Sequence, residues 1–214
     1  MKIKLRKITG RTSLMIFNDD YFYAFIVEGA TEKSIIEILL ENNRFTFSSD
    51  SVINYDLING LDSPYKGPGK FYGCPDNFTN EYLNQEYEEK KIIIFLVEDR
   101  DPAYKIDSIY HEKIQNIYHV ITRPEIEFIE ILYDDDRSDF EKACRRHKTL
   151  KPSEFLSQTR GMKMAEVKRG KRTKVKFQEN IDKLIQVIKS LNSKGSSIQK
   201  STRQPRILLR DLLP

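Results

Sequence analysis

The stretch that decides the fold is Ile92-Ile93-Ile94-Phe95-Leu96-Val97, followed directly by Glu98-Asp99-Arg100-Asp101-Pro102. Six consecutive apolar residues, most of them β-branched or aromatic, predict a strand that is covered on both faces. Pro102 cannot donate to a backbone ladder, so the strand must end at the acids. A second run of the same kind, Tyr21-Phe22-Tyr23-Ala24-Phe25-Ile26-Val27, ends at Glu28-Gly29.

The segments around these two runs alternate between helical and strand-like spacing. From Thr31 the apolar residues follow a helical period, and a third strand is predicted at 117–122. Alternating strands and helices indicate βαβ units. We therefore predict an α/β fold with a mainly parallel, Rossmann-like sheet flanked by helices. Further elements expected from spacing and turn residues are a strand at 52–58 and helices at 76–89, 106–114, 125–133, 140–147, 153–157 and 177–191.

The character of the chain changes along its length, and we divide it into three segments. Residues 1–20 are expected to form an N-terminal strand pair, residues 21–136 the α/β domain, and residues 137–214 a helical, basic C-terminal extension. The apolar tail at 207–213 is compatible with docking on its own core or with binding a partner.

Composition narrows the class of protein. The 214 residues carry a formal charge of +4, a small difference between 36 basic and 32 acidic residues. No apolar run reaches the roughly 18–20 residues of a membrane span, and the start lacks the apolar region of a signal peptide, so we expect a cytoplasmic protein without membrane contact. The two cysteines, Cys74 and Cys144, lack the spacing of a zinc site.

Acidic residues follow both buried strands. The carboxyl ends of parallel strands meet at one edge of a sheet, so Glu28, Asp99 and Asp101 are expected to lie close together there. Clustered carboxylates repel one another unless a hard cation is present, and Mg²⁺ suits such a site, with Mn²⁺ as the substitute. Glu125 is either a further ligand at the same edge or an acid matched to a helix dipole. Glu127 is interpreted as a residue of a solvated helix face.

These residues resemble the Toprim domain found in topoisomerases, bacterial-type primases and small, defence-associated nucleases. Its two motifs are similar to Val27-Glu28-Gly29-Ala30-Thr31-Glu32 and to Val97-Glu98-Asp99-Arg100-Asp101, and the resemblance covers about residues 21–132. It implies that Glu28 is a general acid/base or metal ligand, and that Asp99 and Asp101 hold Mg²⁺ against a phosphodiester. The cysteines of a primase zinc ribbon and the tyrosine-bearing domain of a topoisomerase are missing.

The leading hypothesis is therefore a Mg²⁺-dependent phosphodiesterase, a nuclease that cleaves DNA or RNA. The family context suggests a role in phage defence. The run at 168–176 is interpreted as a backbone-binding arm or as a solvated linker. The residues expected to contact nucleic acid are Arg100, Arg123, Lys168, Arg169, Lys171, Arg172 and Lys174.

Two other classes stay open. The first is a non-catalytic Toprim-like module that binds nucleic acid or a partner such as a defence ATPase. It is favoured by Pro102 where the family motif continues to glycine, and by the additional acid Glu98. The second is a doubly wound fold that binds a nucleotide, although neither a GxGxxG fingerprint nor a Walker loop is present. A homodimer is compatible with each class.

Overall fold

The computed structural model describes residues 17, 20–27, 29–53, 83, 84, 86, 87, 89–98, 110–122, 125–191 and 206–214. Within these residues, four strands form one sheet: β1 (Tyr21–Val27), β2 (Lys91–Glu98), β3 (Ile114–Ile121) and β4 (Arg206–Leu208). Their order is β1-β2-β3-β4, and each neighbouring pair is parallel. The prediction of a mainly parallel, Rossmann-like α/β sheet is confirmed.

The strands β1 and β2 are apolar along most of their length because both of their faces are buried. Tyr23 and Phe25 of β1 point into the main core, whereas Ala24 and Ile26 belong to a second cluster on the opposite face. The residues of β2 alternate in the same way, and Phe95 is fully buried in the main core. A strand of this kind has no solvent face, so its sequence shows no polar alternation.

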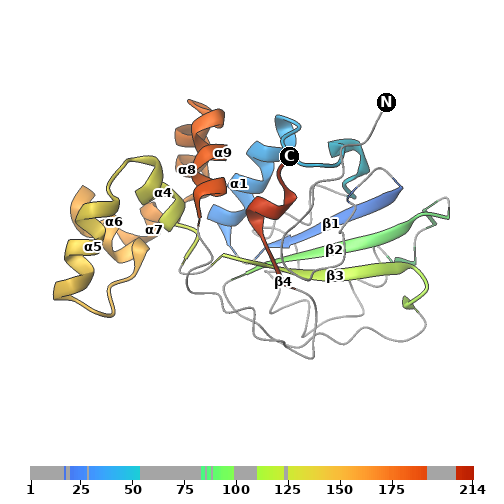
Figure 1. Cartoon of the computed structure of the whole chain (residues 1–214), viewed down its shortest axis with the longest axis horizontal. Helices are drawn as coiled ribbons and strands as arrows, with labels where there is room; N and C mark the ends of the chain where they lie inside the picture. Colours follow the sequence, from blue (N-terminus) through green and yellow to red (C-terminus); the bar gives the residue numbers. More distant parts are fainter. Residues whose placement is uncertain are drawn as a thin grey trace.

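Among the described helices, one group covers a face of the sheet and another lies beyond its edge. Figure 1 shows α1, α8 and α9 on the same side of the strands, with α4 to α7 grouped further out. The bounds are α1 (Ala30–Glu41), α4 (Phe128–Tyr133), α5 (Arg137–Arg146), α6 (Pro152–Arg160), α7 (Met164–Val167), α8 (Gly170–Gln178) and α9 (Ile181–Ser190), with short 3-10 turns η1 (Ser49–Ser51) and η5 (Leu209–Leu212).

The C-terminal tail docks on the chain's own core. β4 pairs with β3, and Ile207, Leu209 and Leu212 are buried in the main apolar cluster. The amide of Thr46 donates a hydrogen bond of 3.0 Å to the carbonyl of Leu212, which ties the tail to the segment after α1. The segment predicted as a helical extension thus contributes a strand to the sheet.

Three predicted helices differ from the observed ones. Residues 111–113 form a turn and Ile114 begins β3, so the helix expected at 106–114 is wrong over its described part. The helix expected from Glu125 begins at Phe128, because the preceding residues form tighter turns in which the amides of Phe128 and Ile129 each bond a carbonyl three residues back. The helix expected at 177–191 is split between α8 and α9.

The other helices of the C-terminal third agree with prediction, since α5 and α6 cover most of the segments expected at 140–147 and 153–157. The strand expected at 52–58 is represented by one bridge between Val52 and Tyr23. The remainder of that strand, most of the N-terminal strand pair and most of the helix expected at 76–89 lie outside the described residues.

Candidate functional site

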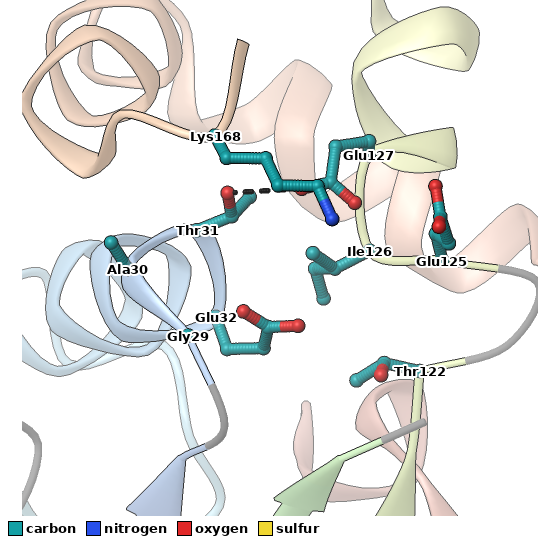
Figure 2. Close-up of a pocket in the computed structure, with 9 residues that line it drawn as sticks. All are labelled: Gly29, Ala30, Thr31, Glu32, Thr122, Glu125, Ile126, Glu127 and Lys168. Carbon is teal, nitrogen blue, oxygen red and sulfur yellow. Dashed lines mark hydrogen bonds between the residues drawn. The ribbon is translucent and has the colours of Figure 1, made fainter. Parts of the chain in front are cut away.

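A pocket of about 220 Å³ opens at the carboxyl ends of β1 and β3 (Figure 2). One wall comes from the turn after β1 and the start of α1, and the other from the segment that joins β3 to α4. β2 lies between these two strands in the sheet. The lining residues are Gly29, Ala30, Thr31, Glu32, Thr122, Glu125, Ile126, Glu127 and Lys168. In parallel sheets this edge is the usual place for a ligand, because loops and helix N-termini converge there.

Glu127 is a buried carboxyl group in this pocket. Its exposed fraction is 5%, and its Oε1 accepts a hydrogen bond of 3.2 Å from the hydroxyl of Thr31. Burial raises the pKa of Glu127, and the charge of Glu125 adds to that rise. The positive charge of Lys168 and the hydrogen bond from Thr31 lower the pKa in part. The expectation that Glu127 belongs to a solvated face is therefore wrong: the tight turns before α4 direct it inward.

Glu32 and Thr122 supply further oxygen atoms. Glu32 lies in the first turn of α1, and its carboxylate reaches across Gly29 toward the middle of the pocket (Figure 2). Thr122 follows the last residue of β3 and is 7% exposed. Within the described part of the chain its hydroxyl has no hydrogen-bond partner. A buried hydroxyl without a partner is costly in a folded protein, so a ligand in the pocket would supply the missing interaction.

Glu125 is held in a fixed orientation by α6. Its Oε2 accepts hydrogen bonds from both the amide and the hydroxyl of Ser153, at 3.1 and 2.8 Å. Its Oε1 lies 3.8 Å from the ammonium group of Lys151. Supporting bonds of this kind orient carboxylates that act at a site. The structure places the sequence-predicted Glu125 on the pocket wall, and the helix that it was expected to open begins three residues later.

Lys168 brings a positive charge to the pocket from the linker between α7 and α8. Its position depends on the close packing of α8 against α1. A Cβ atom on Gly170 would lie 2.6 Å from the backbone oxygen of Ala30 and 2.6 Å from the hydroxyl of Ser34. Such distances are shorter than van der Waals contact, so only glycine allows α8 to approach the first turn of α1 this closely.

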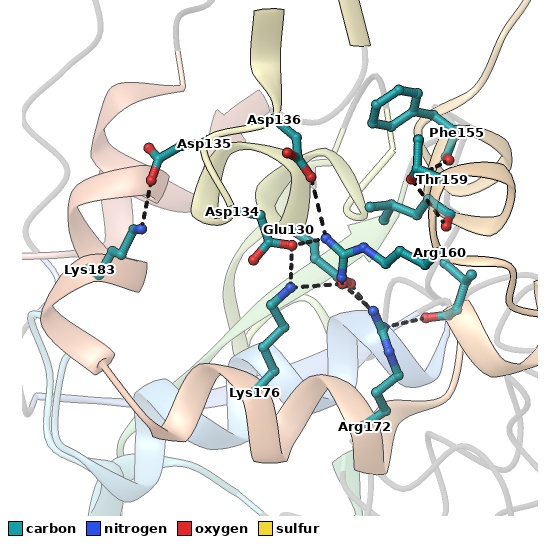
Figure 3. A network of polar contacts seen from close by, with 12 residues as sticks. Glu130, Asp134, Asp135, Asp136, Phe155, Thr159, Arg160, Arg172, Lys176 and Lys183 are labelled. Carbon is teal, nitrogen blue, oxygen red and sulfur yellow. Dashed lines mark hydrogen bonds and ion pairs between the residues drawn. The ribbon is translucent and has the colours of Figure 1, made fainter. Parts of the chain in front are cut away.

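A buried ion cluster joins α4, α6 and α8 (Figure 3). Glu130, whose side chain is 4% exposed, contacts Arg160, Arg172 and Lys176. Burial alone would raise the pKa of Glu130, but hydrogen bonds from Arg172 and Lys176 and their charges lower it overall. Burial lowers the pKa of Lys176, although Glu130 acts in the opposite direction. Asp134 also contacts Arg160 and Lys176, so the cluster contains both acids and bases in close contact.

The cations predicted to bind nucleic acid fall into two groups. Arg172 belongs to the ion cluster, and Lys174 lies 2.5 Å from Glu41 and 3.5 Å from Glu37 of α1. Lys168, Arg169 and Lys171 are exposed. The run at 168–176 is therefore an ordered linker and helix, with part of its charge neutralised internally. A sequence without pairing information cannot separate these two groups.

Five other predicted site residues, Glu28, Asp99, Arg100, Asp101 and Arg123, lie outside the described residues. The residues directly before Glu28, Asp99 and Arg123 are described. Val27 of β1 pairs with Val97 of β2 in register, so the chain leaves two adjacent strands at the same level of the sheet. Glu28 directly follows Val27, and Asp99 directly follows Glu98, the last residue of β2.

Two acids of the pocket were not predicted from the sequence as site residues. Glu32 enters the sequence analysis only as part of the Thr31-Glu32 pair in the family motif, and Glu127 is expected there to face solvent. The signal for Glu127 was the alternation Pro124-Glu125-Ile126-Glu127 directly after a strand, which is typical of an extended or turning segment as much as of a helix start.

Among the residues that the structure describes, no group of three or more histidine, cysteine, aspartate or glutamate side chains is arranged to hold a metal ion. No helix within those same ranges is long and apolar enough to cross a membrane. Comparison of the chain with protein-family models, with curated proteins and with solved structures finds no match.

Proposed function

We propose that the chain is a metal-dependent phosphodiesterase that cleaves nucleic acid at the pocket between the ends of β1 and β3. One observation carries the proposal: residues after β1 and after β3 line a single acidic pocket, and β2, which is followed by Asp99 and Asp101, runs between these strands. The resemblance of the two acidic motifs to the Toprim family supports the same assignment, as does the parallel sheet.

The residues of the pocket fit a hard cation in their chemistry. Carboxylate and hydroxyl oxygens are the atoms that Mg²⁺ prefers, and Thr122 has an unsatisfied buried hydroxyl within the described part of the chain. We propose that Glu28, Asp99, Asp101 and Glu125 hold Mg²⁺ or Mn²⁺, which when bound would supply an activated water and neutralise charge on the phosphate. Lys168 would contact a phosphate oxygen, because it brings positive charge to this pocket wall. Glu127 would hold or release a proton, since its pKa is raised.

The test is cleavage of labelled single-stranded and duplex DNA and RNA in Mg²⁺, Mn²⁺ or EDTA. Wild type is compared with Glu28→Gln and Asp99→Asn, which test the motif acids, and with Lys168→Gln, which tests the pocket wall. Glu141→Gln, on the exposed face of α5, is the matched control. We expect metal-dependent cleavage that falls at least about a hundredfold in the three site variants and is unchanged in the control. Equal cleavage by all variants would exclude this pocket as the active site.

A non-catalytic module is the second candidate, and the state of Glu127 favours it. Burial raises the pKa of Glu127 and so disfavours its charged form, which is the form that binds a metal ion. The pocket would then bind part of a nucleic acid or of a partner such as an ATPase without chemistry. Nucleic-acid binding by folded protein, with no cleavage in any metal, would select this function.

A further inference from the structure

Four exposed cations, here called the track, lie close together in the chain between the end of α5 and the start of α6, and one of them lies beside the pocket wall. Lys151, directly before α6, lies 3.8 Å from Glu125 of the pocket wall, and its side chain is 64% exposed. Lys148 lies three residues before it in a turn closed by a 3.0 Å bond between the amide of Leu150 and the carbonyl of His147. Arg145 and Arg146, in the last turn of α5, precede that turn. All four of these cations are exposed.

These cations differ from their neighbours in their electrostatic surroundings. Earlier in the same helix, Arg137 pairs with Glu141 and Lys142 pairs with Asp139. In α8, Arg172 and Lys174 pair with acids of α4 and α1. Within the described part of the chain, no acidic side chain forms an ion pair with Arg145, Arg146 or Lys148. Charge that is not neutralised within the protein attracts a polyanion most strongly.

The end of a helix explains part of this charge but not all of it. Cations in the last turn favour the helix dipole, and Arg145 and Arg146 occupy that place. Lys148 lies beyond α5, and Lys151 is the N-cap residue of α6, where the helix dipole disfavours a cation. Figure 1 shows α5 at the outer side of the helical group, away from the sheet.

From this arrangement we infer that Arg145, Arg146, Lys148 and Lys151 bind the phosphate backbone of the nucleic acid and guide it to the pocket. The inference rests on the proposed function for the identity of the polyanion. The prediction made from the sequence instead places this contact on Arg100, Arg123 and five cations of the run at 168–176. Arg172 and Lys174 contribute little, because their charges are already paired inside the protein.

The test measures binding without chemistry. Fluorescence anisotropy in EDTA follows binding of labelled duplex and single-stranded DNA and RNA to wild type, to Arg145→Gln/Arg146→Gln and to the matched control Arg137→Gln/Lys142→Gln. Both double variants remove two positive charges from the same helix. We expect the track variant to bind about fivefold or more weakly, and its salt slope on duplex DNA to fall by about 0.9 for each phosphate that is no longer bound. The control is expected to change little.

Equal weakening in the two double variants would overturn the inference, as would a wild type that binds none of the four nucleic acids. Because the assay contains no metal, its result is independent of cleavage. If the protein cleaves no nucleic acid but only the track variant loses binding, the proposed function fails and the inference about the track stands. If wild type cleaves nucleic acid but the two double variants bind it equally well, the proposed function stands and the inference about the track fails.

Discussion

The hydroxyl of Thr31, in the first turn of α1, donates a hydrogen bond of 3.2 Å to Glu127, in the turn before α4. The bond joins two walls of the pocket that come from distant parts of the chain. It lies beside Lys168, whose charge acts on the same carboxyl group. The geometry of the pocket therefore depends on contacts between three separate segments rather than on one motif.

Glu127→Gln is expected to stabilise the protein at neutral pH. The folded pKa of Glu127 is raised above its ordinary value of 4.5 by burial, so wild-type stability falls as the pH rises through that raised pKa. Glutamine keeps an acceptor for Thr31 and removes the cost of burying charge. Thermal unfolding should show a higher Tm for the variant at pH 7 to 8, by about 2–4 °C for each kcal/mol gained, and little difference at pH 4. A lower Tm at pH 8 would mean that the charged form is favoured in the folded protein.

Glu130→Gln is expected to destabilise the protein strongly. The substitution leaves Arg160, Arg172 and Lys176 facing one another without their central carboxylate. Breaking a buried pair costs about 3–5 kcal/mol, and the partial exposure of the cations places this variant toward the lower end. Urea denaturation measures the loss.

The size of this loss depends on pH. The folded pKa of Glu130 lies below its ordinary value of 4.5, so its contribution is present above that value and is lost as the pH falls through the folded pKa. The difference between variant and wild type should therefore shrink in acid. Glu141→Gln, which breaks an exposed pair, serves as the control and should change stability by less than about 1 kcal/mol.

Gly170→Ala is expected to push α8 away from α1. The added methyl group would meet the backbone oxygen of Ala30, which cannot move without disturbing the first turn of α1. Overpacking of this kind costs about 1–3 kcal/mol. Lys171→Ala, at the exposed neighbouring position, should cost far less. Because Lys168 precedes the displaced helix, the binding of nucleic acid at the pocket should weaken as well. A Gly170→Ala protein with wild-type stability would contradict the close approach of α8 to α1.

Asn180→Ala is expected to weaken the start of α9. The Asn180 side chain accepts a hydrogen bond of 2.9 Å from the amide of Lys183. Loss of such a cap costs about 1 kcal/mol, measurable as a lower midpoint of urea unfolding. Glu179→Ala, at an exposed position one residue earlier, keeps the cap and should have a smaller effect. Equal effects would show that the cap contributes nothing.

The parts of the fold that depend on buried, continuous apolar runs could be predicted from the sequence. The runs of β1 and β2 favour a strand strongly, because they are short, β-branched or aromatic, and bounded by acids and turn residues. Helix starts are harder to predict. Asn180 caps the start of α9, but it lies within a stretch of helical apolar spacing. A prediction based on that spacing alone therefore joins the end of α8 to α9.

The pocket was predictable in its location but not in its full membership. Strand ends followed by acids indicate this edge of the sheet, and Glu125 does lie there. The inward carboxyl group of Glu127 accepts a hydrogen bond from Thr31, a contact between distant segments that the sequence does not show. The division of the cations also required the fold, because Glu130 and Glu41 lie far from Arg172 and Lys174 in the chain.

The pairing of β4 with β3 has a consequence for how the protein folds. β4 joins β3 across a long stretch of sequence, so the outer edge of β3 stays open until Arg206–Leu208 pair with it. Closing so long a loop is slow, and an open strand edge can pair with another chain in the meantime. During synthesis, the interval before residues 206–208 emerge is thus a period in which the unpaired edge of β3 can pair with another chain.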